Sequence, residues 1–184
     1  HSVINRCFLE KINGYYQGAC FPFKKGFGSG NVPLMQCPDG SFYSGGTDRG
    51  WGARGGKRFA LDRLVWTGNT PFEVHEMRIQ SDGFELTFTE PVDPVTAVDP
   101  ASYTIGTYTY IFQGRYGSPQ VDATQPTIKS AKVASDGKSV RLVVDGLQIG
   151  HVHELKMAGI KSKADGNPLL HDIAYYTLWH LPKD

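Results

Sequence analysis

The chain has 184 residues, of which 40% are hydrophobic and 20% are charged, a composition typical of a folded globular protein and not of a disordered one. Its 19 basic and 18 acidic residues leave a formal net charge of +1, so no nucleic-acid partner and no electrostatic attraction to a membrane surface are expected. No apolar run approaches the ~20 residues that a membrane-spanning helix needs, so no transmembrane segment is expected.

The first predicted element is a hairpin around Asn13-Gly14, the pair favoured in a two-residue type I′ turn because both positions need φ > 0. This turn sets the register of the two strands and brings Cys7 opposite Cys20, where the Cα atoms lie ~4.5 Å apart, within the range of a disulfide. We therefore expect a Cys7–Cys20 disulfide and, with it, a periplasmic or extracellular location. Two reduced thiols are the alternative, and the role of Cys37 is left open.

More strands follow in this glycine-rich segment, which contains all three cysteines. Residues 32–37 and 41–45 flank the turn Pro38-Asp39-Gly40 and are typical of a second hairpin, and a glycine loop then leads to a strand over residues 59–67. A turn-forming cluster at residues 68–71 ends the segment. We place a domain boundary there, with residues 1–70 as a short antiparallel β-meander.

The second segment, residues 71–184, has the regular patterning of strands. In residues 83–90 hydrophobic and polar side chains alternate, which indicates a strand with one face in a core and one in water. Residues 140–144 repeat this pattern, turns recur about every ten residues, and one short helical turn is expected at residues 94–98. The sequence therefore predicts an all-β protein that ends in an immunoglobulin-like β-sandwich of about seven strands. The predicted core residues are Phe84, Leu86, Phe88, Tyr103, Val140, Leu142 and Leu155.

The loop of residues 47–58 is the stretch that most suggests binding. It combines four basic side chains with glycines, and such a loop can surround an anion or contact a partner. The alternative is a connecting loop whose arginines donate hydrogen bonds to backbone carbonyls. The candidate partner- or anion-binding residues are Asp48, Arg49, Trp51, Arg54, Lys57 and Arg58.

An aromatic stretch suggests a second surface. Tyr108, Tyr110 and Tyr116 offer flat rings that stack on sugars or bury in partner proteins, and the alternative is that alternate rings fill the core. The pair His151 and His153 is a start toward a metal site, but no third ligand stands at a convincing spacing, so no metal is expected. No carboxylate pair or Ser-His-Asp arrangement is visible either, so no catalytic residue and no cofactor are expected.

Two sets of motifs resemble known families. The stretches GFELTFTEPVDP (residues 83–94) and SDGKSVRL (135–142) resemble immunoglobulin-like and fibronectin-type-III-like modules of bacterial surface and periplasmic proteins. The stretches PDGSFYSGG (38–46) and RLVWTG (63–68) resemble the last β-propeller blade of sugar dehydrogenases that use pyrroloquinoline quinone. Together they imply the C-terminal part of a large secreted quinoprotein, and the absence of an initiator Met also favours a piece of a longer protein.

A single blade does not make a propeller, and no part of this chain matches the blades that supply the family's quinone-binding residues. The first functional hypothesis is therefore a non-catalytic structural or protein-binding module of a larger, redox-related assembly, docked through residues 1–70. A fragment of a quinone-dependent sugar dehydrogenase is the enzymatic alternative. A glycan-binding module is the third.

Overall fold

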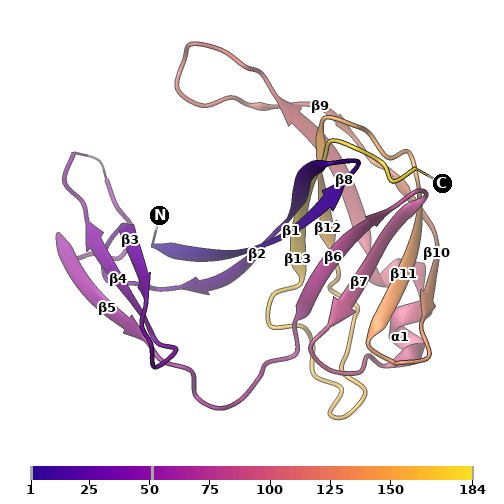
Figure 1. The fold of residues 1–184 in the computed structure, drawn as a ribbon, viewed down its shortest axis with the longest axis horizontal. Coiled ribbons are helices and arrows are strands. Elements are labelled where there is room, and N and C mark those ends of the chain that lie inside the picture. The colour runs from indigo at the N-terminus through magenta and orange to yellow at the C-terminus, as the bar shows by residue number, and fades with distance from the viewer. Residues whose placement is uncertain (1, 51, 184) are drawn as a thin grey trace. The chain divides into compact units, whose positions relative to one another are not determined.

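A computed structural model describes residues 2–50 and 52–183, and it is built almost entirely of antiparallel β-sheet (Figure 1). The predicted all-β fold class is confirmed. The elements are β1 (Val3–Ile12), β2 (Tyr15–Lys25), β3 (Asn31–Gln36), β4 (Phe42–Thr47), β5 (Phe59–Leu64), β6 (Val74–Gln80), β7 (Gly83–Phe88), α1 (Pro94–Val98), the 3-10 turn η1 (Pro100–Ser102), β8 (Thr104–Tyr110), β9 (Gln120–Thr124), β10 (Thr127–Val133), β11 (Ser139–Asp145), β12 (His151–Lys156) and β13 (Ile173–Leu178).

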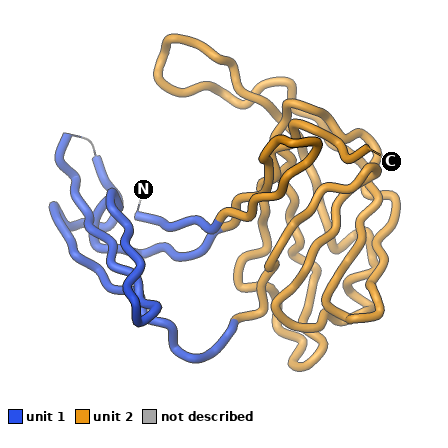
Figure 2. The backbone as a smooth tube through the Cα atoms, in the orientation of Figure 1, with its two compact units in different colours: residues 1–6, 22–70 blue, residues 7–21, 71–184 orange. Residues whose placement is uncertain are grey.

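The chain forms two compact units (Figure 2). Unit 1 contains residues 1–6 and 22–70, and unit 2 contains residues 7–21 and 71–184. One border lies at the expected turn cluster, between Thr70 and Pro71. The first hairpin differs from expectation, because most of it belongs to unit 2 and not to the segment that precedes residue 70.

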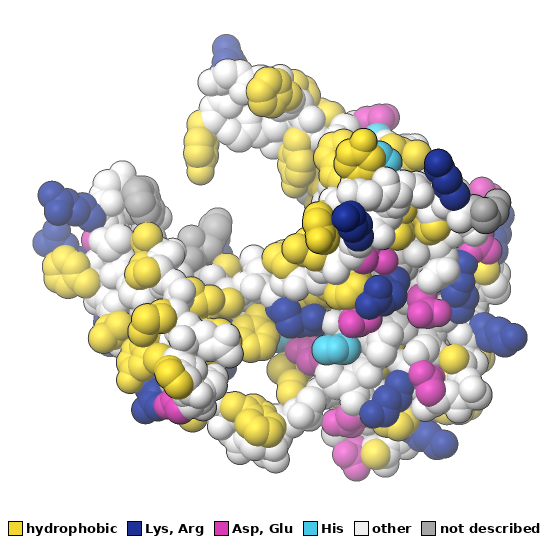
Figure 3. All heavy atoms as spheres, viewed as in Figure 1, with side chains coloured by type: hydrophobic (Ala, Val, Ile, Leu, Met, Phe, Trp, Pro, Cys, Tyr) yellow, Lys and Arg dark blue, Asp and Glu magenta, His cyan; other side chains and the backbone are white. Residues whose placement is uncertain are grey.

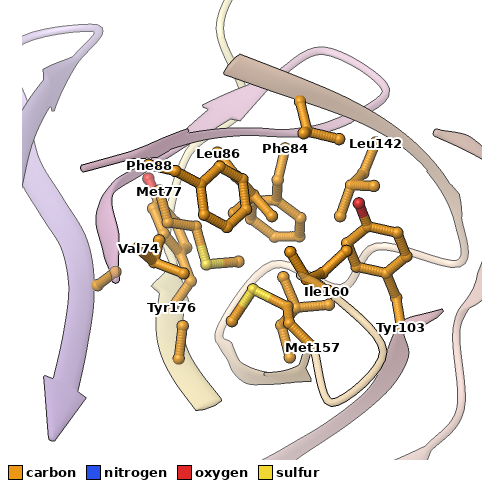
Figure 4. Close-up of a cluster of buried hydrophobic side chains, with 14 of the residues drawn as sticks. Val74, Met77, Phe84, Leu86, Phe88, Tyr103, Leu142, Met157, Ile160 and Tyr176 are labelled. Atoms are coloured by element: carbon orange, nitrogen blue, oxygen red, sulfur yellow. The ribbon is translucent and has the colours of Figure 1, made fainter. Parts of the chain in front are cut away.

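Unit 2 is a β-sandwich of two antiparallel sheets. A six-stranded sheet in the order β1-β2-β13-β12-β8-β9 and a four-stranded sheet in the order β10-β11-β7-β6 contribute their alternate side chains to one hydrophobic core. The two layers meet, for example, where the rings of Phe84 on β7 and Tyr176 on β13 lie 5.3 Å apart (Figure 4). All seven predicted core residues belong to this core, so that prediction is confirmed. The short helix α1 also forms as expected, with Asp93 capping its first turn.

The hairpin joins the sandwich through β2, which pairs with β13, and through a buried polar network. Glu10 lies almost fully buried, and its Oε1 accepts hydrogen bonds from the Tyr176 hydroxyl at 2.6 Å and from the Ile79 backbone N–H at 2.8 Å. Gln17 donates to the same hydroxyl at 2.8 Å. Burial, followed by the hydrogen bond to Glu10, raises the pKa of Tyr176, so its hydroxyl stays a donor. This network contributes to the grouping of residues 7–21 with unit 2.

The turn on which the expected disulfide depends is present, since Asn13 and Gly14 have φ values of 50° and 91°. In contrast to the expectation, no disulfide joins Cys7 and Cys20 in the structure. The hairpin supplies proximity alone, and a bond additionally requires an oxidant that takes up the electrons of the two thiolates.

Unit 1 contains a three-stranded antiparallel sheet in the order β3-β4-β5. The predicted hairpin turn at Pro38-Asp39-Gly40 is formed, with Gly40 at φ 80° and Ser41 donating two hydrogen bonds to Asp39. These hydrogen bonds from Ser41, ahead of the nearby Arg63 charge, lower the pKa of Asp39. The predicted propeller blade is wrong, because a blade is a four-stranded sheet. Here three strands pair with one another, and the preceding hairpin pairs with β13 of the sandwich.

Candidate binding surfaces

The two faces of the β3-β4-β5 sheet differ sharply in their burial. One face is covered by residues 26–30, where Phe27 and Ser29 are buried and Gly46 approaches Ser29 so closely that a Cβ there would lie 2.9 Å from the serine side chain. Ser44 is buried on this side. The other face has no such cover among the described residues, so its side chains meet solvent.

Register shows which side chains share the uncovered face, because residues directly opposite each other in an antiparallel ladder point the same way. Met35, Tyr43 and Arg63 are opposite one another, Leu61 is opposite Gly45, and Phe59 is opposite Thr47. Three of the apolar side chains are highly exposed: Met35 at 60%, Phe59 at 72% and Leu61 at 75%. We call Met35, Tyr43, Phe59, Leu61 and Arg63 the exposed sheet face. Hydrophobic side chains gather over β3–β5 in Figure 3.

Gly45 keeps the middle of this face flat. A Cβ at this position would lie 2.8 Å from the ring of Pro33, so no larger residue fits without moving the neighbouring strand. The Pro33 ring packs against Gly45, so the centre of the face is low and apolar between the protruding side chains of β3 and β5. A flat apolar face with protruding anchors is typical of protein-contact surfaces.

The basic loop of residues 47–58 lies at one end of this sheet, between β4 and β5. Backbone bonds hold its base, from Asp48 to the Arg58 carbonyl at 3.0 Å and from Lys57 to the Gly28 carbonyl at 3.0 Å. Gly55, at φ 115°, comes so close to residues 27–28 that a Cβ would lie 2.4 Å from the Phe27 carbonyl oxygen. The loop is therefore anchored by its backbone, which leaves its side chains to other uses.

The charged side chains of this loop point to solvent. Arg49, Arg54, Lys57 and Arg58 are exposed, and among the described residues no ion pair is recorded for any of them. Arg58 lies over the Phe59 ring at 5.9 Å, which joins the basic loop to the exposed sheet face. The remaining predicted member, Trp51, lies outside the described residues.

The near-neutral total charge hides a strong separation between the units. Residues 1–6 and 22–70 contain eight basic and three acidic residues, a formal net charge of +5, whereas residues 7–21 and 71–184 have a net charge of −4. The sequence interpretation used only the total charge of the chain, and therefore predicted no electrostatic attraction to a charged partner. Unit 1 is therefore a basic surface that carries exposed apolar groups.

The predicted tyrosine surface is brought together only in part. Tyr108 and Tyr110 lie side by side on β8 with ring centroids 5.6 Å apart, and Tyr110 is half exposed. Burial, followed by the hydrogen bond with Tyr110, raises the pKa of Tyr108, which keeps its hydroxyl protonated. Tyr116 is fully exposed in the loop between β8 and β9, and among the described ring pairs it is in contact with neither Tyr108 nor Tyr110.

A pocket of about 380 Å³ opens beside these rings, between β8, β9 and β12. It was not predicted, because it depends on which strands become neighbours. The side chains that line it include Thr104, Tyr108, Gln120, Thr124, Glu154 and Lys156. One signal in the sequence could have indicated part of this lining. Glu154 and Lys156 alternate with the hydrophobic Leu155, which is buried, so both point away from the core.

The two histidines of β12 have separate roles. His153 is buried, and its Nε2 accepts a hydrogen bond from the Gln148 backbone N–H at 3.2 Å. His151 lies 3.0 Å from the Asp122 carboxylate. No group of three or more metal-ligating side chains occurs among the described residues. Within the same residues, no helix is long and apolar enough to cross a membrane.

Comparisons with known proteins do not assign this chain to a family. No family model and no curated protein matches the chain. Among solved structures, it is similar to the N-terminal part of the bacterial S-layer protein SbsC, with 24% identity and a TM-score of 0.44 over 59% of this chain and 24% of that chain. It is also similar to SbsC domains 1-6, with 26% identity and a TM-score of 0.43, over 59% of this chain and 14% of that chain. The rSbsC(31-844) structure matches at 25% identity and a TM-score of 0.45, over 60% and 14%.

The chain thus spans about a quarter or less of the length of these S-layer structures. The expected relationship to quinone-dependent sugar dehydrogenases is wrong, because the described strands of residues 31–64 form a three-stranded sheet and not the four-stranded blade on which it rested. The motifs behind that resemblance are a Pro-Asp-Gly turn and a short hydrophobic strand, which many antiparallel sheets share.

Proposed function

We propose that this chain is a non-catalytic structural or protein-binding module of a larger extracellular assembly, which it contacts through the exposed sheet face. The observation that carries the proposal is the exposure of Met35, Phe59 and Leu61 on one side of a sheet whose other side is covered. Burying a large apolar side chain contributes about 1.5–3 kcal/mol. The burial energy of three such side chains is comparable with the lower part of the range for the entropic cost of association, about 4–15 kcal/mol.

The partner that fits is a protein with an acidic, partly apolar surface. Unit 1 has a net charge of +5, and the basic side chains of residues 47–58 border the apolar face. Opposite charge on a partner steers the encounter, while the apolar anchors supply the affinity. The surface therefore combines positive charge with aromatic rings: Arg58 and Arg63 lie over the rings of Phe59 and Tyr43, and arginine and aromatic side chains are common in interface hot spots.

The strand β5 offers a second mode of contact on the same surface. It is an edge strand of its sheet and contains no proline, whereas the other edge, β3, contains Pro33 in its centre. Proline blunts an edge because it lacks a donor, so β5 is the edge suited to pairing with an added strand. Such an added strand would extend the sheet beside Phe59 and Leu61.

Site-directed photo-crosslinking in the native host tests the docking surface. A photo-reactive residue in place of Leu61 should give one main adduct, with an acidic protein. Val95 on α1 provides a matched control, because both side chains are apolar and 75% exposed, but Val95 belongs to unit 2. We expect the adduct from position 61 to exceed that from position 95 by roughly tenfold, the ratio that 1.4 kcal/mol of preferential contact produces.

A charge-reversed variant, with Arg49, Arg54 and Lys57 all changed to Glu, should abolish the adduct, since it removes the steering charge. Equal adducts from positions 61 and 95 would contradict the docking surface. An adduct formed only with a second copy of this chain, or one that survives charge reversal, would contradict the acidic partner.

The extracellular part of the proposal is tested by the hairpin thiols. The protein is isolated from its native compartment under alkylating conditions, and its peptides are mapped without reduction. Cys7 and Cys20 should then occur in one linked peptide, because an oxidising compartment joins thiols that a hairpin holds close together. Ready alkylation of both thiols without reductant would remove this support. Cys37, outside the hairpin, serves as the internal reference for an unlinked thiol.

A further inference from the structure

We infer that the pocket between β8, β9 and β12 is a binding site for a neutral saccharide. It is a site distinct from the docking surface proposed above, because its residues belong to unit 2 and those of the docking surface to unit 1. Its volume of about 380 Å³ lies at the small end of the ~300–1,000 Å³ typical of small-molecule sites. A pocket of this size suits one or two sugar rings rather than a folded partner.

The pocket forms on the outer side of the six-stranded sheet. Ile105 and Leu155 are register partners that point into the core, so their neighbours Gly106 and Glu154, also register partners, point to the outer side. Gly106 leaves the floor open, since a Cβ there would meet only the Thr124 carbonyl oxygen, at 3.8 Å. The hollow is therefore the space that a side chain at position 106 would occupy.

A bulge in β9 forms the wall. The register of β8 and β9 shifts between Thr107 and Thr109, and Asp122 in the bulged strand has φ 54°. A bulge bends its strand, and this one is fixed by the Asp122 carboxylate, which lies 3.0 Å from His151 on β12. The wall is thus held in place by side chains outside the pocket, as a preformed site requires.

The lining of the pocket contains both hydrogen-bond donors and hydrogen-bond acceptors, close to one another. Glu154 accepts, Lys156 donates, and the side chains of Thr104, Gln120 and Gln125 do both. Glu154 and Lys156 pair at 3.2 Å, so the pocket carries no net charge from these two groups. A ligand rich in hydroxyls, each a donor and an acceptor, satisfies such a lining, whereas an anion would meet the Glu154 carboxylate.

Aromatic rings complete the site. Tyr108 lines the pocket, Tyr110 lies next to it, and Tyr175 faces Glu154 across the β12–β13 ladder. A ring beside hydroxyl-binding side chains provides the apolar contact for the C–H face of a sugar, while the phenol hydroxyls remain polar. Tyr108 is only 8% exposed, so the apolar contact comes from the part of this residue that lines the pocket, and the hydrogen-bonding side chains supply the remaining contacts.

Saturation-transfer NMR with the purified 184-residue chain tests the site. The probes are four neutral disaccharides: cellobiose, maltose, lactose and N,N′-diacetylchitobiose. We expect at least one to bind saturably, with a dissociation constant of about 1 mM or tighter. Gly106→Val should weaken that binding at least tenfold, because the new side chain fills the pocket, and Glu154→Gln should weaken it by about tenfold, because a charged acceptor is lost.

Gly52→Val is the matched control, because position 52 belongs to unit 1 and a Cβ there would meet nothing within 4 Å. This variant should bind the disaccharide as the wild type does. Thermal unfolding checks that each variant is folded, and if Gly106→Val is not, the result for Glu154→Gln decides. Failure of all four disaccharides to bind below about 10 mM would overturn the inference. Binding that survives both pocket substitutions would overturn it as well, because the sugar would then occupy another surface.

Discussion

Replacing Phe88 by alanine should lower the free energy of unfolding of unit 2 by about 3–5 kcal/mol, the range for truncation of a buried phenylalanine. Phe88 is 2% exposed at the end of β7, and its ring lies 5.8 Å from that of Phe72. It points into the core among side chains of both sheets (Figure 4). The truncated residue leaves a cavity that the surrounding sheets cannot fill without bending. Urea unfolding followed by circular dichroism measures the loss.

Phe59→Ala is the matched control for this prediction. Phe59 also lies on a strand, in unit 1, but its side chain is 72% exposed. Its truncation should therefore change the free energy of unfolding of unit 1 by no more than about 0.5 kcal/mol. A Phe88→Ala variant that unfolds at the same urea concentration as the wild type would place Phe88 on the surface and contradict the strand assignment. A large loss for Phe59→Ala would instead show that the exposed sheet face is covered in solution.

The sandwich was predictable because its signal is local. Alternation in β7 and β11 marks, within a few residues, which side chains face the core, and the structure has Phe84, Leu86, Val140 and Leu142 buried as expected. The pairing of β2 with β13 is not local, since these strands are more than 100 residues apart, and no pattern within either strand names its neighbour. Sequence reasoning therefore found the hairpin but not its pairing with β13.

Glu10 illustrates the same limit for a polar residue. A lone glutamate on an amphipathic strand is expected in water. Here it is buried because the Tyr176 hydroxyl and the Ile79 N–H converge on it from β13 and β6. Only the folded arrangement brings these two donors together, so the sequence contains no indication of it.

The candidate sites divide in the same way. The tyrosine pair on β8 was predictable from spacing, because residues two apart on a strand share a face. Gly106 and Glu154 were not, since their adjacency depends on the pairing of β8 with β12. The basic loop was visible in sequence, but its connection to an apolar sheet face required the register of β4 with β5.

Acid should destabilise unit 2 through His153 on β12. Burial, ahead of the nearby charge of His151, lowers the pKa of His153 from 6.5 to about 4. The folded state therefore favours the neutral ring, which packs 5.7 Å from the Phe84 ring. Between about pH 6.5 and pH 4 the unfolded chain binds a proton at this residue that the folded chain does not, so the free energy of unfolding falls as the pH falls through this window. The full difference is about 3 kcal/mol, at 1.36 kcal/mol for each pKa unit.

Urea unfolding of the wild type and of His153→Gln at pH 7 and at pH 4 isolates this contribution, because the carboxylates that titrate in the same range are common to both proteins. Glutamine keeps an acceptor for the Gln148 N–H but has no proton to gain, so the wild type should lose about 3 kcal/mol more than the variant. His75→Gln is the control, since its side chain is 62% exposed, and it should follow the wild type. If His153→Gln instead shows the same loss as the wild type, His153 is protonated in the folded chain, and the burial of its ring between the sheets is wrong.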